Sequence, residues 1–252
     1  MEEYDDLVGG VDSEGTLDIS HKDFNEIDEN VWDFEERLKI LNVSFNRIHE
    51  ICGGVARLQF LTVLDASCNR LDKLCPEIGE CVRLKTLKLN GNKLKTIPEE
   101  IGQLRILEEL YLSENEIETV PESIGKLKSL RVVTLQNNKL KELDAALGEC
   151  ISIESLDCSN NPDLINIPQN LLDDTATMMW MLAFQRGLIK NFRDMKKSNI
   201  ELEQHAKLAD KTRVANSQLK VENDKLRKLV DKYEDERPEI YLKIKSKVCV
   251  IM

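Results

Sequence analysis

Apolar residues recur along the chain in a rhythm that repeats every 23 residues. A typical unit contains the segment LKTLKLNGNKL, which spans residues 84–94. Six units have an asparagine at the same place, at intervals of 23 residues: Asn46, Asn69, Asn92, Asn115, Asn138 and Asn161. A strict repeat of this length predicts a solenoid, in which similar units stack and bury a continuous core between them.

Each unit has two halves with different patterns. In the first half, Leu87 and Leu89 are two residues apart, which places both side chains on one side of a short strand, facing the core. We expect Asn92 to satisfy backbone groups where the chain leaves the strand, and so to stack on its neighbours. The second half contributes apolar and glycine columns to the convex side: Ile78, Ile101, Ile124 and Leu147; Gly79, Gly102, Gly125 and Gly148; Cys81, Leu104, Leu127 and Cys150.

The unit with its IPxxIGxLxxL half resembles the leucine-rich repeats of Ras-suppressor and plant intracellular Ras-group proteins, over about two thirds of the chain. The resemblance implies an α/β leucine-rich-repeat solenoid with short parallel strands on its concave face. Proteins of this type bind other proteins, often around small GTPases and their kinases. The resemblance therefore implies a protein partner, with a small GTPase or its effector complex as the specific hypothesis.

Changes of pattern divide the chain into five predicted segments. Residues 1–13 form an acidic tail, and residues 14–170 form about seven repeats, of which the first copy, LDISHKDFNEI, has Lys22 in place of asparagine. Irregular end copies are expected, because they cap an otherwise exposed core. The remaining segments are a cap helix, a long helical arm and a lysine-containing tail, at residues 171–192, 193–237 and 238–252.

The arm contains neither glycine nor proline, which predicts a long helix. Its apolar positions fit about three heptads of a coiled coil, with d positions Leu219, Leu226 and Tyr233 and a positions Asn216, Asn223 and Val230. One hypothesis is a homodimer joined through this seam. The alternative is a single amphipathic helix, alone or folded back on the solenoid.

The residues between the inward leucines line the concave side of the predicted sheet, here called the sheet face. Its central column is Asp18, Asn42, Asp65, Lys88, Tyr111, Thr134 and Asp157. We predict that the partner binds five of these: Asp65, Lys88, Tyr111, Thr134 and Asp157. Tyr111, Lys88 and Asp65 are expected to contribute most, because aromatic and charged residues at the centre of an interface dominate its energy. The alternative is that these are ordinary solvated strand residues.

Composition and charge exclude several other classes of protein. A net charge of −11 argues against a nucleic-acid-binding surface, and seven scattered cysteines without a CxxC pair indicate neither a disulfide framework nor a zinc site. The first residues lack a secretory signal, and the longest apolar run, residues 176–184, is too short to cross a membrane. Three histidines without a shared motif predict no catalytic residues, and no metal or bound cofactor is expected. We expect Cys81, Cys150 and Cys158 to be core residues.

The sequence ends in Cys249-Val-Ile-Met252, which matches a prenylation box of the farnesyl type. We expect a prenyltransferase to attach a covalent farnesyl group to Cys249. One lipid chain binds membranes only weakly, so nearby positive charge should supplement it. Three lysines precede the box, Lys243, Lys245 and Lys247. Resemblance to Ras-type tails implies removal of residues 250–252 and methylation of the new end.

Two functional hypotheses follow. The leading one is a prenylated adaptor, peripheral at a cytoplasmic membrane face, whose sheet face recruits a protein partner. The alternative is a soluble regulatory subunit of a phosphatase or kinase complex that uses its C-terminal helix for assembly. Both predict a binding protein and not an enzyme.

Overall fold

The computed structural model describes residues 10–168, 171–172, 174–187, 190–191 and 194. The chain divides into two compact units, Met1–Leu188 and Ile189–Met252. The first unit contains the repeats and is described below. The predicted coiled-coil positions of the arm lie outside the described residues.

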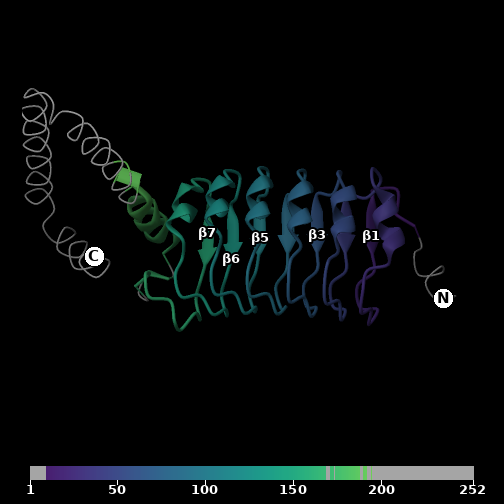
Figure 1. Cartoon of the computed structure of the whole chain (residues 1–252), viewed down its shortest axis with the longest axis horizontal. Helices are drawn as coiled ribbons and strands as arrows, with labels where there is room; N and C mark the ends of the chain where they lie inside the picture. The colour runs from purple at the N-terminus through teal and green to yellow at the C-terminus, as the bar shows by residue number, and fades with distance from the viewer. Residues whose placement is uncertain (1–9, 169–170, 173, 188–189, 192–193, 195–252) are drawn as a thin grey trace, which may run out of the picture. The chain divides into compact units, whose positions relative to one another are not determined.

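Seven strands form one parallel sheet whose order follows the order of the chain (Figure 1). Their bounds are β1 (Thr16–Asp18), β2 (Ile40–Asn42), β3 (Val63–Asp65), β4 (Thr86–Lys88), β5 (Glu109–Tyr111), β6 (Val132–Thr134) and β7 (Ser155–Asp157). Equivalent residues of successive repeats pair directly, as Leu64 with Leu87 and Leu87 with Leu110. The parallel sheet of short strands predicted from the sequence is therefore confirmed.

A 3₁₀ helix lies between each strand and the next. The six are η1 (Glu29–Phe34), η2 (Gly53–Arg57), η3 (Pro76–Glu80), η4 (Glu99–Gln103), η5 (Glu122–Lys126) and η6 (Ala145–Glu149). They pack so closely that a Cβ atom on Gly102 of η4 would lie 2.7 Å from the backbone oxygen of Ser123 in η5. The glycine column seen in the sequence is thus required by the approach of neighbouring helices.

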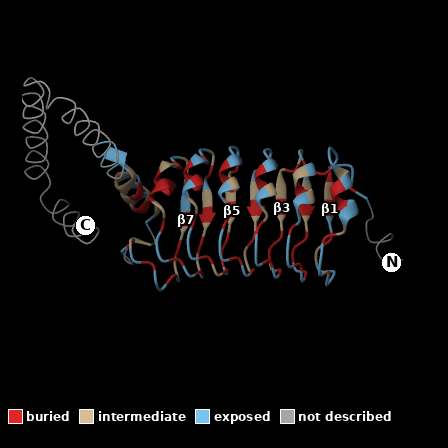
Figure 2. Cartoon of the chain, in the orientation of Figure 1, coloured by how far each residue is buried: buried red, intermediate tan, exposed pale blue. Residues whose placement is uncertain are grey.

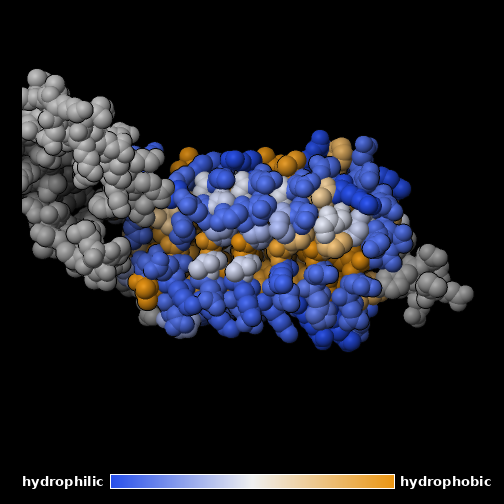
Figure 3. Space-filling model, viewed as in Figure 1, coloured by the Kyte–Doolittle hydropathy of each residue, from blue (hydrophilic) through white to orange (hydrophobic). Residues whose placement is uncertain are grey.

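The core runs through the repeats between the sheet and the 3₁₀ helices (Figure 2). Leu87 and Leu89 are completely buried, and so are their equivalents Leu110 and Leu135. In the view of Figure 3, a band of hydrophobic residues follows the repeats between two hydrophilic margins. The inward direction of both strand leucines is therefore confirmed.

The buried asparagines form the expected ladder. The Oδ1 of Asn92 accepts from the backbone N of Leu71 at 2.9 Å, and its Nδ2 donates to the carbonyls of Leu89 at 2.9 Å and Ala66 at 3.0 Å. The carbonyl of Leu89 also accepts from Asn115 in the next repeat. Each asparagine therefore links its own turn to the preceding repeat, and the carbonyl shared by two successive asparagines continues the ladder.

A helix over residues 175–187 follows the repeats. Its Met178 and Leu182 are completely buried against the last repeat, and Thr175 accepts a hydrogen bond from the backbone N of Leu156 in β7. It thereby covers the end of the core. Trp180 in the same helix is 54% exposed and stacks on Phe184. The predicted bounds of the cap, 171–192, stay a prediction.

The buried cysteines give a direct test of the core. Burial raises the pKa of Cys81 to about 12 and the pKa values of Cys150 and Cys158 to about 11. Since the thiolate is the reactive form, these three should resist N-ethylmaleimide in the native protein at pH 7.5, whereas exposed Cys52 should react. Peptide mass spectrometry before and after unfolding in urea measures this. Rapid native labelling of Cys81 would contradict the described core.

Candidate protein-binding surface

The strand register places the predicted partner-binding residues in one row. Asp65 pairs with Lys88, Lys88 with Tyr111, Tyr111 with Thr134, and Thr134 with Asp157. Each is partly exposed, while the leucine or valine before it in the strand is buried. The structure thus brings all five together on the sheet face. Their role in binding stays a prediction.

Two of these residues also stabilise the fold, a role that the sequence reasoning missed. The Oδ1 of Asp65 accepts from the backbone N of Ser67 at 3.1 Å and from its hydroxyl at 2.6 Å. Asp157 makes the same pair of bonds with Ser159, and Asn42 makes them with Ser44. The recurring Asp/Asn-x-Ser spacing at the strand ends was the available signal. Such local bonds satisfy backbone groups where the strand turns.

The central residues interact through weak polar contacts. Lys88 Nζ lies 3.4 Å from Asp65 Oδ2, and the hydroxyl of Tyr111 donates to Glu109 at 3.3 Å. Partial burial and the neighbouring Glu109 raise the pKa of Tyr111. The hydroxyl of Thr134 accepts from the backbone N of Leu112 at 3.3 Å. These contacts are long and only partly buried, so a partner could replace them at little cost.

An exposed aromatic pair at the N-terminal end of the sheet face was not predicted. Phe45 follows β2, is 51% exposed, and stacks on His21 with ring centroids 4.4 Å apart. Phe45 has a φ of 55°, in the left-handed region that bulky residues rarely adopt. The equivalent position carries Asn137 and Asn160 in later repeats, with nearly the same φ. His21 and Phe45 occupy the equivalent position of the first two repeats, so the repeat register was the available signal for this pair.

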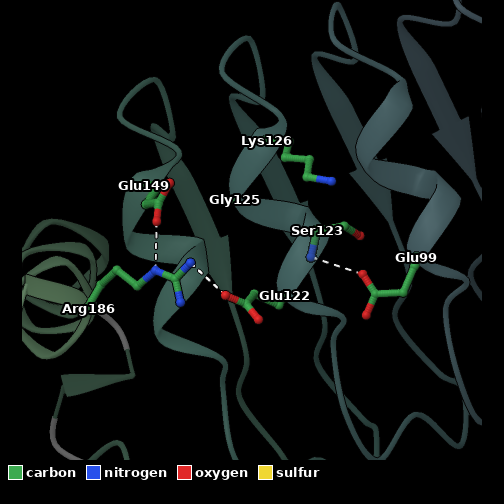
Figure 4. A pocket seen from close by; sticks show the side chains of 7 residues that line it. All are labelled: Glu99, Glu122, Ser123, Gly125, Lys126, Glu149 and Arg186. Atoms are coloured by element: carbon green, nitrogen blue, oxygen red, sulfur yellow. Dashed lines mark hydrogen bonds and ion pairs between the residues drawn. The ribbon is translucent and has the colours of Figure 1, made fainter. Parts of the chain in front are cut away.

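A shallow cavity of about 420 Å³ lies on the convex side (Figure 4). Arg186 of the cap helix reaches two carboxylates there, Glu149 at 2.6 Å and Glu122 at 2.7 Å. These pairs lower the pKa of Glu149 and raise that of Arg186. Since its acidic groups already hold Arg186, the cavity serves to fasten the cap helix to η5 and η6.

Within the described residues, no cluster of His, Cys, Asp or Glu is arranged to hold a metal ion. In the same part of the chain, no helix is both long enough and apolar enough to span a bilayer. The predicted lipid site, Cys249, and the predicted membrane-facing lysines, Lys243, Lys245 and Lys247, lie outside the described residues.

Comparison with known proteins agrees with this architecture. A family model described as a leucine-rich repeat region matches residues 75–174. A leucine-rich-repeat protein of Leptospira interrogans, LIC12759, is 31% identical with a TM-score of 0.57, and the match covers 58% of this chain and 37% of that one. This chain therefore spans little more than a third of that structure. None of the curated sequences matches significantly.

Two plant proteins are among the other similar structures. The plant peptide hormone receptor RGFR1, in complex with RGF2, is 26% identical with a TM-score of 0.49, covering 54% of this chain and 22% of the receptor. The ectodomain of GASSHO1/SCHENGEN3 from Arabidopsis thaliana is 24% identical with a TM-score of 0.47, and the match covers 54% of this chain and 19% of that one. The repeat region, the register of the sheet and the Leptospira structure agree with one another. The repeats of this chain therefore form a leucine-rich-repeat solenoid, a fold that suggests a protein-binding scaffold.

Proposed function

We propose that this protein is an adaptor that binds a protein partner through its sheet face and is held at a cytoplasmic membrane face by a lipid on Cys249. The first part rests on one observation: seven in-register strands present an unbroken row of partly exposed polar and aromatic side chains. Such a surface is wide and shallow, which suits a protein better than a small molecule. The resemblance to Ras-group repeats makes a small GTPase or its effector complex the first partner to test.

Site-specific cross-linking in cells tests the sheet face. A photoreactive benzoylphenylalanine at Tyr111 keeps an aromatic ring at the centre of the row, and the same residue at Ile151, 87% exposed beside η6, is the matched control. We expect a discrete cross-linked protein from the Tyr111 variant and none from the control. Cross-linking at Ile151 alone would place the partner on the other side and refute the proposal.

The membrane part of the proposal is supported by the motif at residues 249–252 and by the three lysines before it. Replacing Cys249 with serine should move most of the protein from the membrane fraction to the soluble fraction. A Cys52→Ser variant is the control. Mass spectrometry of the C-terminal peptide identifies both the last residue and any farnesyl group. An unmodified peptide, with unchanged fractionation of Cys249→Ser, would favour the soluble regulatory subunit instead.

A further inference from the structure

The charged residues of the sheet face are mostly acidic. In each repeat we count the residue of the central column, the residues two positions before and two positions after it, and the residue with positive φ that follows. These positions carry one ammonium group, Lys88, and five carboxylates: Asp18, Asp65, Glu109, Glu114 and Asp157. Among the described residues, Asp65 is the only one of the five in a salt bridge. The other four make no salt bridge in this part of the chain, although Arg131 interacts electrostatically with Glu109.

Charges elsewhere on the repeats are arranged differently. Lys85 pairs with Glu108 at 2.9 Å, Arg131 with Glu154 at 2.9 Å, and Lys139 with Glu116 at 2.7 Å, in each case one repeat apart. The same 23-residue stacking could pair charges on the sheet face but does so once. Like charges on one surface repel each other and attract a partner of opposite sign.

Two uncharged groups on this surface respond to the negative potential. The pKa of the Cys68 thiol is raised by partial burial and then by Glu114 and Asp65. The pKa of Tyr111 is raised by partial burial and then by Glu109. Both shifts disfavour a further negative charge at the centre of the sheet face.

The carboxylates also have a regular spacing. They belong to the repeats of β1, β3, β5 and β7. Asp18, Asp65 and Asp157 occupy the central column, whereas in the repeat of β5 the central residue is Tyr111, and Glu109 and Glu114 lie on either side of it. Neighbouring strands are roughly 4.8 Å apart, so the repeats that carry a carboxylate recur about every 10 Å. A polyproline II segment has three residues per turn and rises about 3.1 Å per residue. It therefore presents every third side chain on one face at nearly the same spacing.

Two aromatic residues lie near the acidic positions. Phe45 follows β2, between Asp18 and Asp65, and Tyr111 is in β5 beside Glu109. Polyproline II ligands commonly dock their prolines on exposed aromatic rings. The positive φ of Phe45 belongs to the turn of every repeat, because the equivalent residues His21, Cys68, Gly91, Glu114, Asn137 and Asn160 share it, and the Phe45 side chain is 51% exposed there.

We propose that the sheet face binds an extended polyproline II segment of a protein partner, with a lysine or arginine at every third position and proline against Phe45. This inference rests on the proposed function and specifies the chemistry of its partner. The basic side chains meet the carboxylates of alternate strands. The segment needs no groove, because it lies across the strands.

Fluorescence anisotropy with two labelled peptides tests the spacing. One contains four Lys-Pro-Pro units, and the other has the same composition with its lysines clustered at one end. We expect the periodic peptide to bind the full chain about tenfold more tightly, because it can pair with more than one carboxylate at once. Equal binding of both peptides, or binding of neither, would overturn the inference.

Conservative variants test the residues. Asn42 makes the same serine bonds as Asp65 and Asp157, so Asp65→Asn with Asp157→Asn should remove charge without removing those bonds. This double substitution should lower the affinity for the periodic peptide roughly tenfold, as the loss of two exposed ion pairs predicts. A matched pair on the 3₁₀ helices, Glu77→Gln with Glu100→Gln, should leave binding unchanged. Equal weakening by both pairs would indicate attraction to net charge alone and refute the inference.

Phe45→Asn places at this position the residue that later repeats use with the same φ. We expect the variant to keep the thermal midpoint of the wild type and to lose affinity for the periodic peptide by roughly tenfold. Unchanged affinity would refute the role of Phe45.

If neither peptide binds but Tyr111 still cross-links a cellular protein, the polyproline II inference falls and the proposed function stands. If Tyr111 captures nothing, the proposed function falls.

Discussion

Replacing Asn92 with alanine should lower the free energy of unfolding by about 3 kcal/mol. The backbone N of Leu71 donates to Asn92 Oδ1 at 2.9 Å in a completely buried position, and the variant leaves it without an acceptor. The carbonyls of Ala66 and Leu89 lose one donor each but keep another, from Asn69 and Asn115. The main cost is therefore the unsatisfied Leu71 donor, with a smaller cost for the space left by the amide.

Urea unfolding monitored by circular dichroism measures this loss. Asn90→Ala, two residues earlier on the sheet face, is the matched control, because the Asn90 side chain makes none of the ladder bonds. We expect the control to change the free energy by less than about 0.5 kcal/mol. Similar losses for the two variants would show that the ladder does not stabilise the repeats as described.

Replacing Gly148 with valine should destabilise the end of the solenoid by about 3 kcal/mol or more. Even the first added carbon would lie 2.6 Å from the Cα of Ala183, a backbone atom of the cap helix. The helix must then move away, which exposes the buried Met178 and Leu182 and strains the ion pairs of Arg186 with Glu122 and Glu149. Loss of a cap exposes the core of a repeat protein to water.

Thermal unfolding and binding of a hydrophobic dye in the native state measure the effect. Gly187→Ala is the control, because an added carbon there meets no atom within 4 Å and alanine favours the helix. The valine variant should bind dye and melt earlier, whereas the control should match or exceed the stability of the wild type. A Gly148 variant that melts like the wild type would contradict the close packing of the cap.

Much of the fold was predictable because the repeats are nearly identical. A 23-residue period fixes which residues of successive units are neighbours, so the pairing of Leu64 with Leu87, and of Lys88 with Tyr111, followed from counting. The asparagine ladder followed from the hydrogen-bonding capacity of the amide at a turn. The glycine column was visible in the sequence, although its reason, the 2.7 Å approach at Gly102, was not.

The candidate surface was predictable only in part. The row from Asp65 to Asp157 was found because outward positions alternate with buried ones in a strand. The structural role of Asp65 was missed, although its serine partner is only two residues away. The stack of Phe45 on His21 was missed, although the two residues occupy the equivalent position of the first two repeats.

The sequence by itself determined the repeat, the inward leucines and the columns of the sheet face, because a regular solenoid converts spacing along the chain into neighbours in space. Only the tertiary structure decided which of those neighbours interact. Among the residues that the structure describes, it paired Lys88 with Asp65, left four other carboxylates of the sheet face outside salt bridges, and turned Trp180 outward. These outcomes depend on side-chain conformations and on contacts between repeats. The period of the sequence specifies which residues are neighbours, but it does not specify the conformations of their side chains.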